Sequence, residues 1–270
     1  MSTTTLPAPT FTLAPVGSPH AAALRAEWTK LRTLRSAWTT MAIAIVAAVT
    51  LAALSASSNA RNWKDMPADE RLAFDPVAVS LIGVLFGALV LGALGVRTMS
   101  SEYSTGMIRT TAAAMPRRSR FLWSKVIVIA GTTFVVAMIA NIAGFVIGQA
   151  ALRSEDLDVS ITADGSIKAI VAGAIAVSAF AVIGVGLATI VKRASVANIL
   201  MALVVIGGQL VGTAMPPSAR RFLPFNALQA SVSVKRTDEL LSQGIALGFI
   251  VGYAVVAVAI GACLLQRRDV

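Results

Sequence analysis

Apolar residues along this chain gather into six long runs, and short polar segments separate each run from the next. Each run holds about twenty residues or more, enough for a helix to cross roughly 30 Å of hydrocarbon. The third run is longer than one crossing, so we expect it to begin outside the hydrocarbon. We therefore predict an all-helical membrane protein with spans at residues 37–56, 77–96, 121–148, 167–191, 196–213 and 243–265.

The polar segments between the runs carry several boundary signals. Asp75 followed by Pro76 predicts a helix start, with a capping carboxylate and proline in the first turn. Lys192 and Arg193 separate the fourth and fifth runs so briefly that these two must form an antiparallel hairpin. Residues 214–242 contain interrupting prolines, and we predict short interfacial helices there.

The N-terminal region divides into two parts. Residues 1–20 are rich in proline and threonine without a continuous apolar stretch, which is typical of a disordered tail and not of a signal peptide. From residue 21 to 35, Leu24, Trp28 and Leu31 recur at helical spacing, which predicts an amphipathic interfacial helix. We therefore divide the chain into a tail, 1–20, and a single six-span transmembrane domain, 21–270.

Composition supports a membrane protein and excludes several chemistries. Apolar residues make up 56% of the chain and charged residues 13%, with a mean hydropathy of +0.78, whereas charged residues approach about 25% in soluble domains. One cysteine and one histidine leave no disulfide framework, no cysteine cluster for zinc and no embedded serine–histidine pair. The chain also lacks a phosphate-loop motif, so we do not expect it to be an enzyme that hydrolyses ATP.

The net charge of +10 is concentrated beside the apolar runs, not along a basic stripe of the kind that binds nucleic acid. Successive spans cross in opposite directions, so the segments that flank them form two sets on opposite sides of the membrane. One set holds 14 of the 23 basic residues. Basic residues favour the cytoplasmic side, so this excess places both termini in the cytoplasm. The 14 are Arg25, Lys30, Arg32, Arg35, Arg97, Arg109, Arg117, Arg118, Arg120, Lys125, Lys192, Arg193, Arg267 and Arg268.

No Asp, Glu, Lys or Arg lies in the middle of any predicted span. Proton relays and ion paths use such residues, so their absence argues against a proton-coupled transporter. Four polar residues remain in the runs, and we consider them either as lining a substrate path or, preferably, as making hydrogen bonds between helices. They are Asn141, Gln149, Asn198 and Gln209.

A long polar and basic stretch, residues 101–118, lies between the second and third runs. Glu102, Gly106 and Pro116 occur there in a fixed order, and a basic pair follows the proline. Glycine and proline punctuate the backbone, so we predict a compact surface element. The simpler alternative is an ordinary loop whose basic residues set the orientation.

This stretch, EYSTGMIRTTAAAMPRR, resembles the loop between spans two and three of type 2 ATP-binding-cassette (ABC) exporter permeases, especially the small drug-exporter-like ones. The resemblance extends over about residues 25–268. It implies a coupling helix that docks on an ATPase. Many members have threonine after the glycine, where this chain has Met107. The residues that the resemblance assigns to ATPase coupling are Glu102, Gly106, Met107, Arg109, Pro116, Arg117 and Arg118.

The resemblance also implies the assembly. A permease of this kind sits in the cell membrane, pairs with an identical or related permease and works with two copies of a cytosolic ABC ATPase. ATP and Mg²⁺ would bind that partner, and this chain would hold no cofactor. The alternatives are a secondary transporter and a membrane anchor or regulator of an ATPase. The sequence does not specify a substrate.

We further expect Glu102 and Arg109 to occupy different parts of the stretch, because Gly106 lies between them. Glu102 would brace neighbouring helix ends, and Arg109 would face the ATPase. Exposed charge pairs contribute only about 0–1 kcal/mol. On that premise, replacing either residue by alanine should leave the fold intact.

Overall fold

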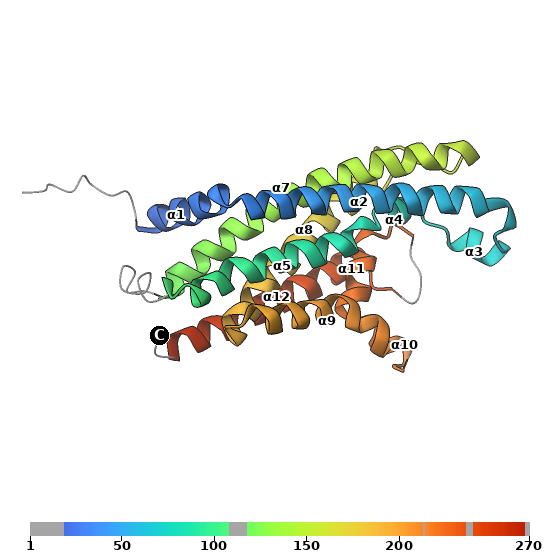
Figure 1. Cartoon of the computed structure of the whole chain (residues 1–270). Coiled ribbons are helices and arrows are strands. Elements are labelled where there is room, and N and C mark those ends of the chain that lie inside the picture. The colour runs from blue at the N-terminus through green and yellow to red at the C-terminus, as the bar shows by residue number, and fades with distance from the viewer. Residues whose placement is uncertain (1–18, 108–117, 213, 236–239, 268–270) are drawn as a thin grey trace, which may run out of the picture.

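The computed structural model of the protein describes residues 19–107, 118–212, 214–235 and 240–267, and within these ranges every regular element is a helix (Figure 1). The predicted all-helical class is therefore confirmed for this part of the chain. The tail up to residue 18 and most of the coupling stretch, residues 108–117, lie outside the described ranges.

Five helices are long and apolar enough to cross a membrane, and a sixth is apolar but shorter. The five are α2 (Arg35–Asn62), α5 (Gly83–Ser104), α7 (Arg118–Leu152), α8 (Ser166–Val191) and α12 (Gln243–Arg267), and the shorter one is α9 (Ala194–Gly212). All six lie on the predicted apolar runs, and α2, α5 and α7 extend several residues beyond a predicted end.

Short helices fill the connections. They are α1 (Pro19–Thr33), α3 (Ala68–Ala73), α4 (Pro76–Ser80), α10 (Pro217–Arg220) and α11 (Pro224–Val232), with single 3₁₀ turns η1 (Trp63–Asp65) and η2 (Arg153–Glu155). The helix start predicted at Asp75 is confirmed, because its carboxylate accepts hydrogen bonds from the backbone of Val77 and Ala78 and Pro76 opens the helix.

The second predicted span is not one continuous helix, as the sequence suggested, but breaks between α4 and α5 at Leu81 and Ile82. Gly83 follows the break and lies against the backbone of Ala48 in α2, so closely that an added methyl group would overlap it. Apolar character continues through the break, which explains why the hydropathy pattern alone did not reveal it.

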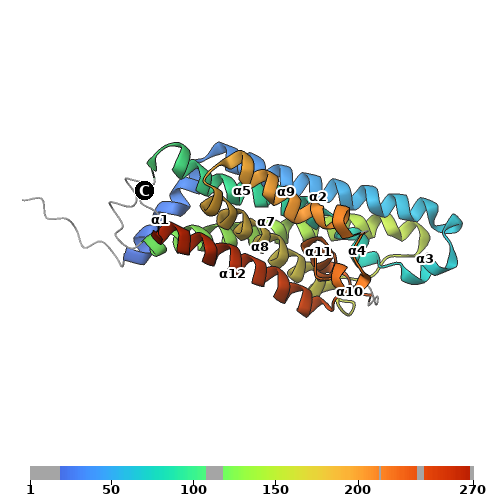
Figure 2. The ribbon, with the colours of Figure 1, turned by 90° about the horizontal axis from the view of Figure 1, so that it is seen from below.

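Helix α8 forms the centre of the bundle and packs against α5, α7, α9, α11 and α12 (Figure 2). Its contact with α5 depends on two glycines: a Cβ at Gly95 would overlap the Ala181 carbonyl, and a Cβ at Gly184 would overlap the Gly92 carbonyl. Small residues let membrane helices approach this closely. Phe180 of α8 is fully buried.

Helix α11, one of the short helices that the sequence predicts within residues 214–242, is packed into the bundle core. Ala227 and Leu228 are completely buried where α11 packs on α8, α9 and α12. The hydroxyl of Tyr253 in α12 donates to the Phe222 carbonyl at 2.6 Å, just before α11 begins. An apolar helix of nine residues is too short to span a membrane, but it is long enough to fill a gap between longer helices.

The helix ends divide between the two ends of the bundle. Helix α1, the C-terminal ends of α5 and α12 and the start of α7 lie at one end, and α3, α4 and α10 lie toward the other (Figures 1 and 2). This arrangement brings the flanks that carry the basic excess together at one end. That end is the one that we predict to face the cytoplasm.

Candidate functional site

Helix α1 packs on the bundle through a face that includes a charged residue. Ala23, Glu27 and Leu31 are buried against α7, whereas Trp28 is 45% exposed. A helix is therefore present where the sequence predicts one, and Glu27 shares its buried face with Leu31. The buried position of a carboxylate, Glu27, requires a partner to compensate for its desolvation.

That partner belongs to a ring of four charged side chains, Glu27 and Lys30 of α1, Glu102 of α5 and Lys125 of α7. The Lys125 ammonium lies 2.6 Å from Glu27 Oε2 and 3.2 Å from Glu102 Oε1. The Lys30 ammonium lies 2.8 Å from Glu102 Oε1 and 3.3 Å from Glu27 Oε1. Each lysine thus contacts both carboxylates, and the formal charge of the charge ring is zero.

The charge ring is largely removed from solvent. The side chains of Lys125, Glu102 and Glu27 are 2%, 4% and 8% exposed, and that of Lys30 is 36% exposed. Partial burial opposes the charge on Lys30, but its hydrogen bond to Glu102 and the two nearby carboxylates raise its pKa above the ordinary value. Within the described part of the chain, Glu102 Oε2 has no hydrogen-bond partner. Removing one ion from such a compensated group destabilises the fold, because another buried charge is left unpaired.

From the sequence we expect Glu102 to be an exposed bracing residue, but the structure buries it. It does contact neighbouring helix ends, but as a buried ion. Glu27 and Lys125 were not selected as functional candidates, because charges near the ends of apolar runs are usually solvated or interfacial. The local signal was the Glu27–Lys30 spacing on α1, but nothing in the sequence indicated that α5 and α7 would meet it.

Three further contacts fix the C-terminal part of α5 to its neighbours. The Tyr103 hydroxyl lies 3.4 Å from the Thr189 carbonyl of α8, and the Lys192 ammonium lies 5.6 Å from the centre of the Tyr103 ring. Arg97 reaches the Thr40 hydroxyl of α2 at 3.4 Å. The helix that enters the coupling stretch is thus tied to α1, α2, α7 and α8.

The coupling stretch begins with a defined turn. Helix α5 ends at Ser104, and Gly106 has a φ of +71°, a conformation that glycine adopts without the steric cost of a Cβ atom. Met107 follows with 44% of its surface exposed. Arg109, Pro116 and Arg117 lie outside the described residues, and Arg118 is the first residue of α7.

A hollow of about 240 Å³ adjoins the charge ring, and its lining includes Thr105 and Met107 from the start of the coupling stretch. Both glutamates of the ring line it and both are paired with lysine, so neither is arranged as a free general acid or base. No group of three metal-ligating side chains occurs among the described residues. The arrangement suits a mechanical connection between helices better than catalysis.

The four polar residues of the spans have separate surroundings. Asn141 Nδ2 donates to the Ile170 carbonyl of α8 at 3.0 Å. Gln149 Nε2 donates to Ser80 Oγ at 2.9 Å, and its Oε1 accepts from the Val159 backbone. Asn198 and Gln209 lie on α9, where Gln209 is exposed and Asn198 Oδ1 is buried without a partner among the described residues.

A second polar connection lies at the opposite end of the bundle. Asp75 Oδ1 caps α4, and its Oδ2 accepts from the backbone of Val234 at 2.7 Å and of Lys235 at 2.9 Å, and from Ser233 Oγ at 3.0 Å. A single carboxylate therefore joins the start of α4 to the segment after α11. The sequence identified Asp75 as a cap but not this second role.

Comparison with known families gives a match over most of the bundle. The family described as ABC-2 family transporter protein matches residues 23–208, from α1 almost to the end of α9, and this range includes the charge ring and the coupling stretch. No individual curated protein matches the chain significantly. Because the family match covers more than half of the chain, this membrane protein belongs to the ABC-2 transporter family.

Proposed function

We propose that the chain is the permease subunit of an ABC exporter in the cell membrane, and that residues 101–115 couple it to a separate cytosolic ATPase. Its partners would be two ATPase copies, which bind ATP and Mg²⁺, and a second permease subunit, identical or related. Together the two permeases would form the substrate path. Family membership and the apolar helices support the permease role.

The observation that carries the coupling proposal is the position of the charge ring. Glu102 lies four residues before Gly106, and Lys125 lies in the second turn of α7, so the charged contacts join the two helices on either side of residues 108–117. Glu27 and Lys30 attach α1 to the same point. A force applied to the loop would therefore reach three helices together.

The contacts of Tyr103 extend this connection to α8, at the centre of the bundle. Closely packed helices and buried ions resist independent movement, so closure of the ATPase pair would tilt the helices as a group. Without the buried ion contacts, a force on the loop would move one helix end and leave the others in place. In this mechanism the ATPase supplies the chemistry, and this chain supplies the path and the lever.

Gly106 allows a test of the coupling stretch. No atom lies near the position of a Cβ at this residue, so substitutions there act through the backbone and not through a clash. Valine resists positive φ, at a cost on the order of 1–3 kcal/mol, whereas asparagine tolerates it. We expect Gly106→Val to reduce transport and partner ATPase stimulation together, with normal membrane insertion, and Gly106→Asn to stay close to wild type.

The measurement is the ATPase rate of the reconstituted complex, with co-purification of the ATPase as the second readout. Arg109→Glu, which reverses a charge in the stretch, should also weaken co-purification. If Gly106→Val and Arg109→Glu both leave coupling and co-purification unchanged, the stretch is an ordinary charged loop and the proposal fails.

Two alternatives remain distinct from this proposal, and vesicle transport separates them. A secondary transporter would move substrate in a proton gradient without any ATPase, and an ATPase anchor or regulator would move none with ATP present. The spans provide no central ionisable residue for proton coupling, which is why we favour the ATP-driven permease.

A further inference from the structure

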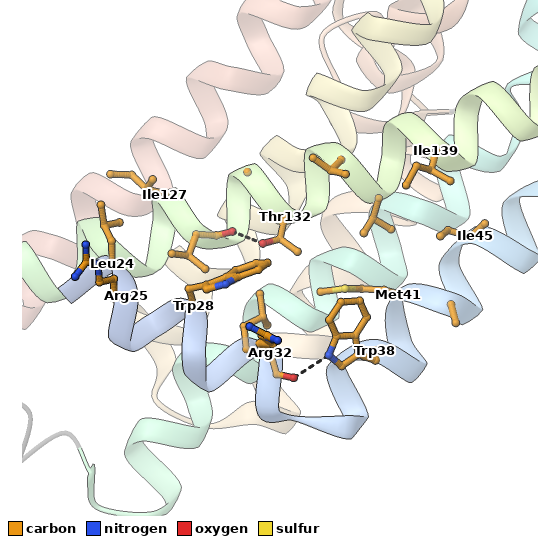
Figure 3. A pocket seen from close by; sticks show the side chains of 16 residues that line it. Leu24, Arg25, Trp28, Arg32, Trp38, Met41, Ile45, Ile127, Thr132 and Ile139 are labelled. Atoms are coloured by element: carbon orange, nitrogen blue, oxygen red, sulfur yellow. Dashed lines mark hydrogen bonds between the residues drawn. The ribbon is translucent and has the colours of Figure 1, made fainter. Parts of the chain in front are cut away.

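A groove of about 750 Å³ lies between α1, the first turns of α2 and the middle of α7 (Figure 3). This size is within the range of about 300–1,000 Å³ that is typical of small-molecule sites. The groove and the charge ring use different side chains of α1. Its walls are mostly apolar, with Met41 and Ile45 from α2 and Ile127, Val135 and Ile139 from α7.

The charged residues that line the groove are Arg25 and Arg32, both on α1. They are seven residues apart, which places them on one face of the helix about 10 Å apart along its axis. Both are exposed, and neither forms an ion pair within the described part of the chain. The acidic residue of α1, Glu27, is turned away and paired with Lys125. The charged border of the groove is thus entirely positive.

Two tryptophans shape this end of the groove. Trp38 Nε1 donates to the Arg32 carbonyl at 2.9 Å and so fixes the corner at Leu34 where α1 gives way to α2. Trp28 lines the same hollow from α1 (Figure 3). Tryptophan favours the boundary between hydrocarbon and headgroups. The groove therefore has an apolar part, an aromatic boundary and a cationic end, held in place by a hydrogen bond.

We propose that this groove binds an anionic phospholipid, with an acyl chain along α7 and the phosphate between Arg25 and Arg32. The predicted orientation makes it a lipid of the cytoplasmic leaflet. Basic pockets beside membrane helices bind anionic headgroups, and the apolar walls exceed what a free phosphate ion needs. A second copy of the chain fits less well, because a symmetric contact through this face would bring its Arg25 and Arg32 against the same two residues of the first copy.

Gly131 of α7 provides a way to fill the groove. It lines the hollow, and an added Cβ there would meet no atom. Gly131→Leu should therefore occupy the space of the acyl chain without disturbing the protein. Gly248 of α12 has equally open surroundings outside the groove, so Gly248→Leu is a matched control.

The chain has four tryptophans, and two of them line the groove. In a Trp63→Phe, Trp123→Phe background, quenching of the fluorescence of Trp28 and Trp38 reports which lipid occupies the groove. The protein is reconstituted in phosphatidylcholine nanodiscs that contain a minor fraction of acyl-brominated lipid, either phosphatidylglycerol or phosphatidylcholine. We expect brominated phosphatidylglycerol to quench the tryptophan fluorescence at a much lower fraction of the total lipid than brominated phosphatidylcholine does.

The double variant Arg25→Gln, Arg32→Gln should lose about 30-fold in relative affinity for the anionic lipid, the equivalent of about 1 kcal/mol for each cation. Arg193→Gln, an exposed charge outside the groove, should leave the preference unchanged. Gly131→Leu should weaken quenching, and Gly248→Leu should not.

Three results would overturn the proposal. Equal quenching by both lipids would mean that ordinary solvating lipid fills the groove. A preference that survives removal of both arginines would place the anionic lipid elsewhere. Tryptophans that neither lipid quenches would mean that protein or another molecule covers the groove. Nanodiscs expose both leaflets to the same lipid, so an error in the predicted orientation or function leaves this test valid.

Discussion

Replacement of Lys125 by methionine tests whether the charge ring holds the three helices together. Methionine keeps most of the apolar stem of lysine but removes its charge. The substitution deletes two of the four charged contacts, those of 2.6 Å to Glu27 and 3.2 Å to Glu102, and leaves the contacts of Lys30. Two buried carboxylates then share one cation that is 36% exposed.

Removing one partner of a buried ion pair costs about 3–5 kcal/mol. Because Lys30 still contacts both carboxylates, we expect Lys125→Met to destabilise the protein by an amount near the lower limit, about 3 kcal/mol. The exposed pair of Lys64 and Glu155, at 3.5 Å with 80% of the Lys64 side chain exposed, is the matched control. Lys64→Met should cost at most about 1 kcal/mol.

A second substitution separates lost charge balance from lost packing. In Lys125→Met, Glu27→Gln, the formal charge returns to zero and the 2.8 Å pair between Lys30 and Glu102 remains. Neutral replacements of buried ion pairs are often close to neutral in stability, so the double variant should be more stable than Lys125→Met alone. The coupling energy between the two substitutions, which is the difference between the double variant's stability change and the sum of the two single changes, should be about 0.5–3 kcal/mol.

The assay is unfolding of the purified protein in mixed micelles by increasing denaturing detergent, followed by circular dichroism. The reasoning is refuted if Lys125→Met unfolds at the same detergent fraction as Lys64→Met. It is also refuted if Glu27→Gln adds its own destabilisation to that of Lys125→Met, because buried charge imbalance would then not be the cause.

Two other predictions concern the opposite end of the bundle and the topology. Asp75→Ala removes the carboxylate that caps α4 and leaves three donors of the segment after α11 without their acceptor. Hydrogen bonds to a charged group contribute about 1.5–3 kcal/mol each, so proteolysis near residues 233–235 should accelerate markedly; an unchanged cleavage rate would contradict this role. In a Cys263→Ala background, an impermeant reagent applied to intact cells should label a cysteine at Asp69 but not one at Ser104, and labelling of the Ser104 site would contradict the predicted orientation.

Hydropathy was sufficient to locate the six apolar helices, because a helix that crosses hydrocarbon must satisfy its own backbone hydrogen bonds over about twenty residues. Local capping chemistry was sufficient to predict the helix start at Asp75 and Pro76. The positive φ of Gly106 also follows from local preference. These features depend on neighbours in the sequence, and the sequence therefore predicts them.

The charge ring required information that no local pattern contains. Glu27, Glu102 and Lys125 come from three helices, and each one separately resembles an ordinary charge at the end of an apolar run. The break at Leu81 likewise depends on how closely α2 approaches Gly83. Contacts of this kind are decided when whole helices pack.

Helix α1 shows the division most directly. Its sequence determined that it would be an amphipathic helix, because apolar and charged residues recur at helical spacing. Its inward face was decided by the tertiary structure: pairing Glu27 with Lys125 compensates for burial of a carboxylate, whereas Trp28 tolerates an exposed position beside the groove. Hydrophobic periodicity determines which apolar residues favour burial. Which charged residues can be buried beside them depends on the ion-pair partners that the packed bundle provides.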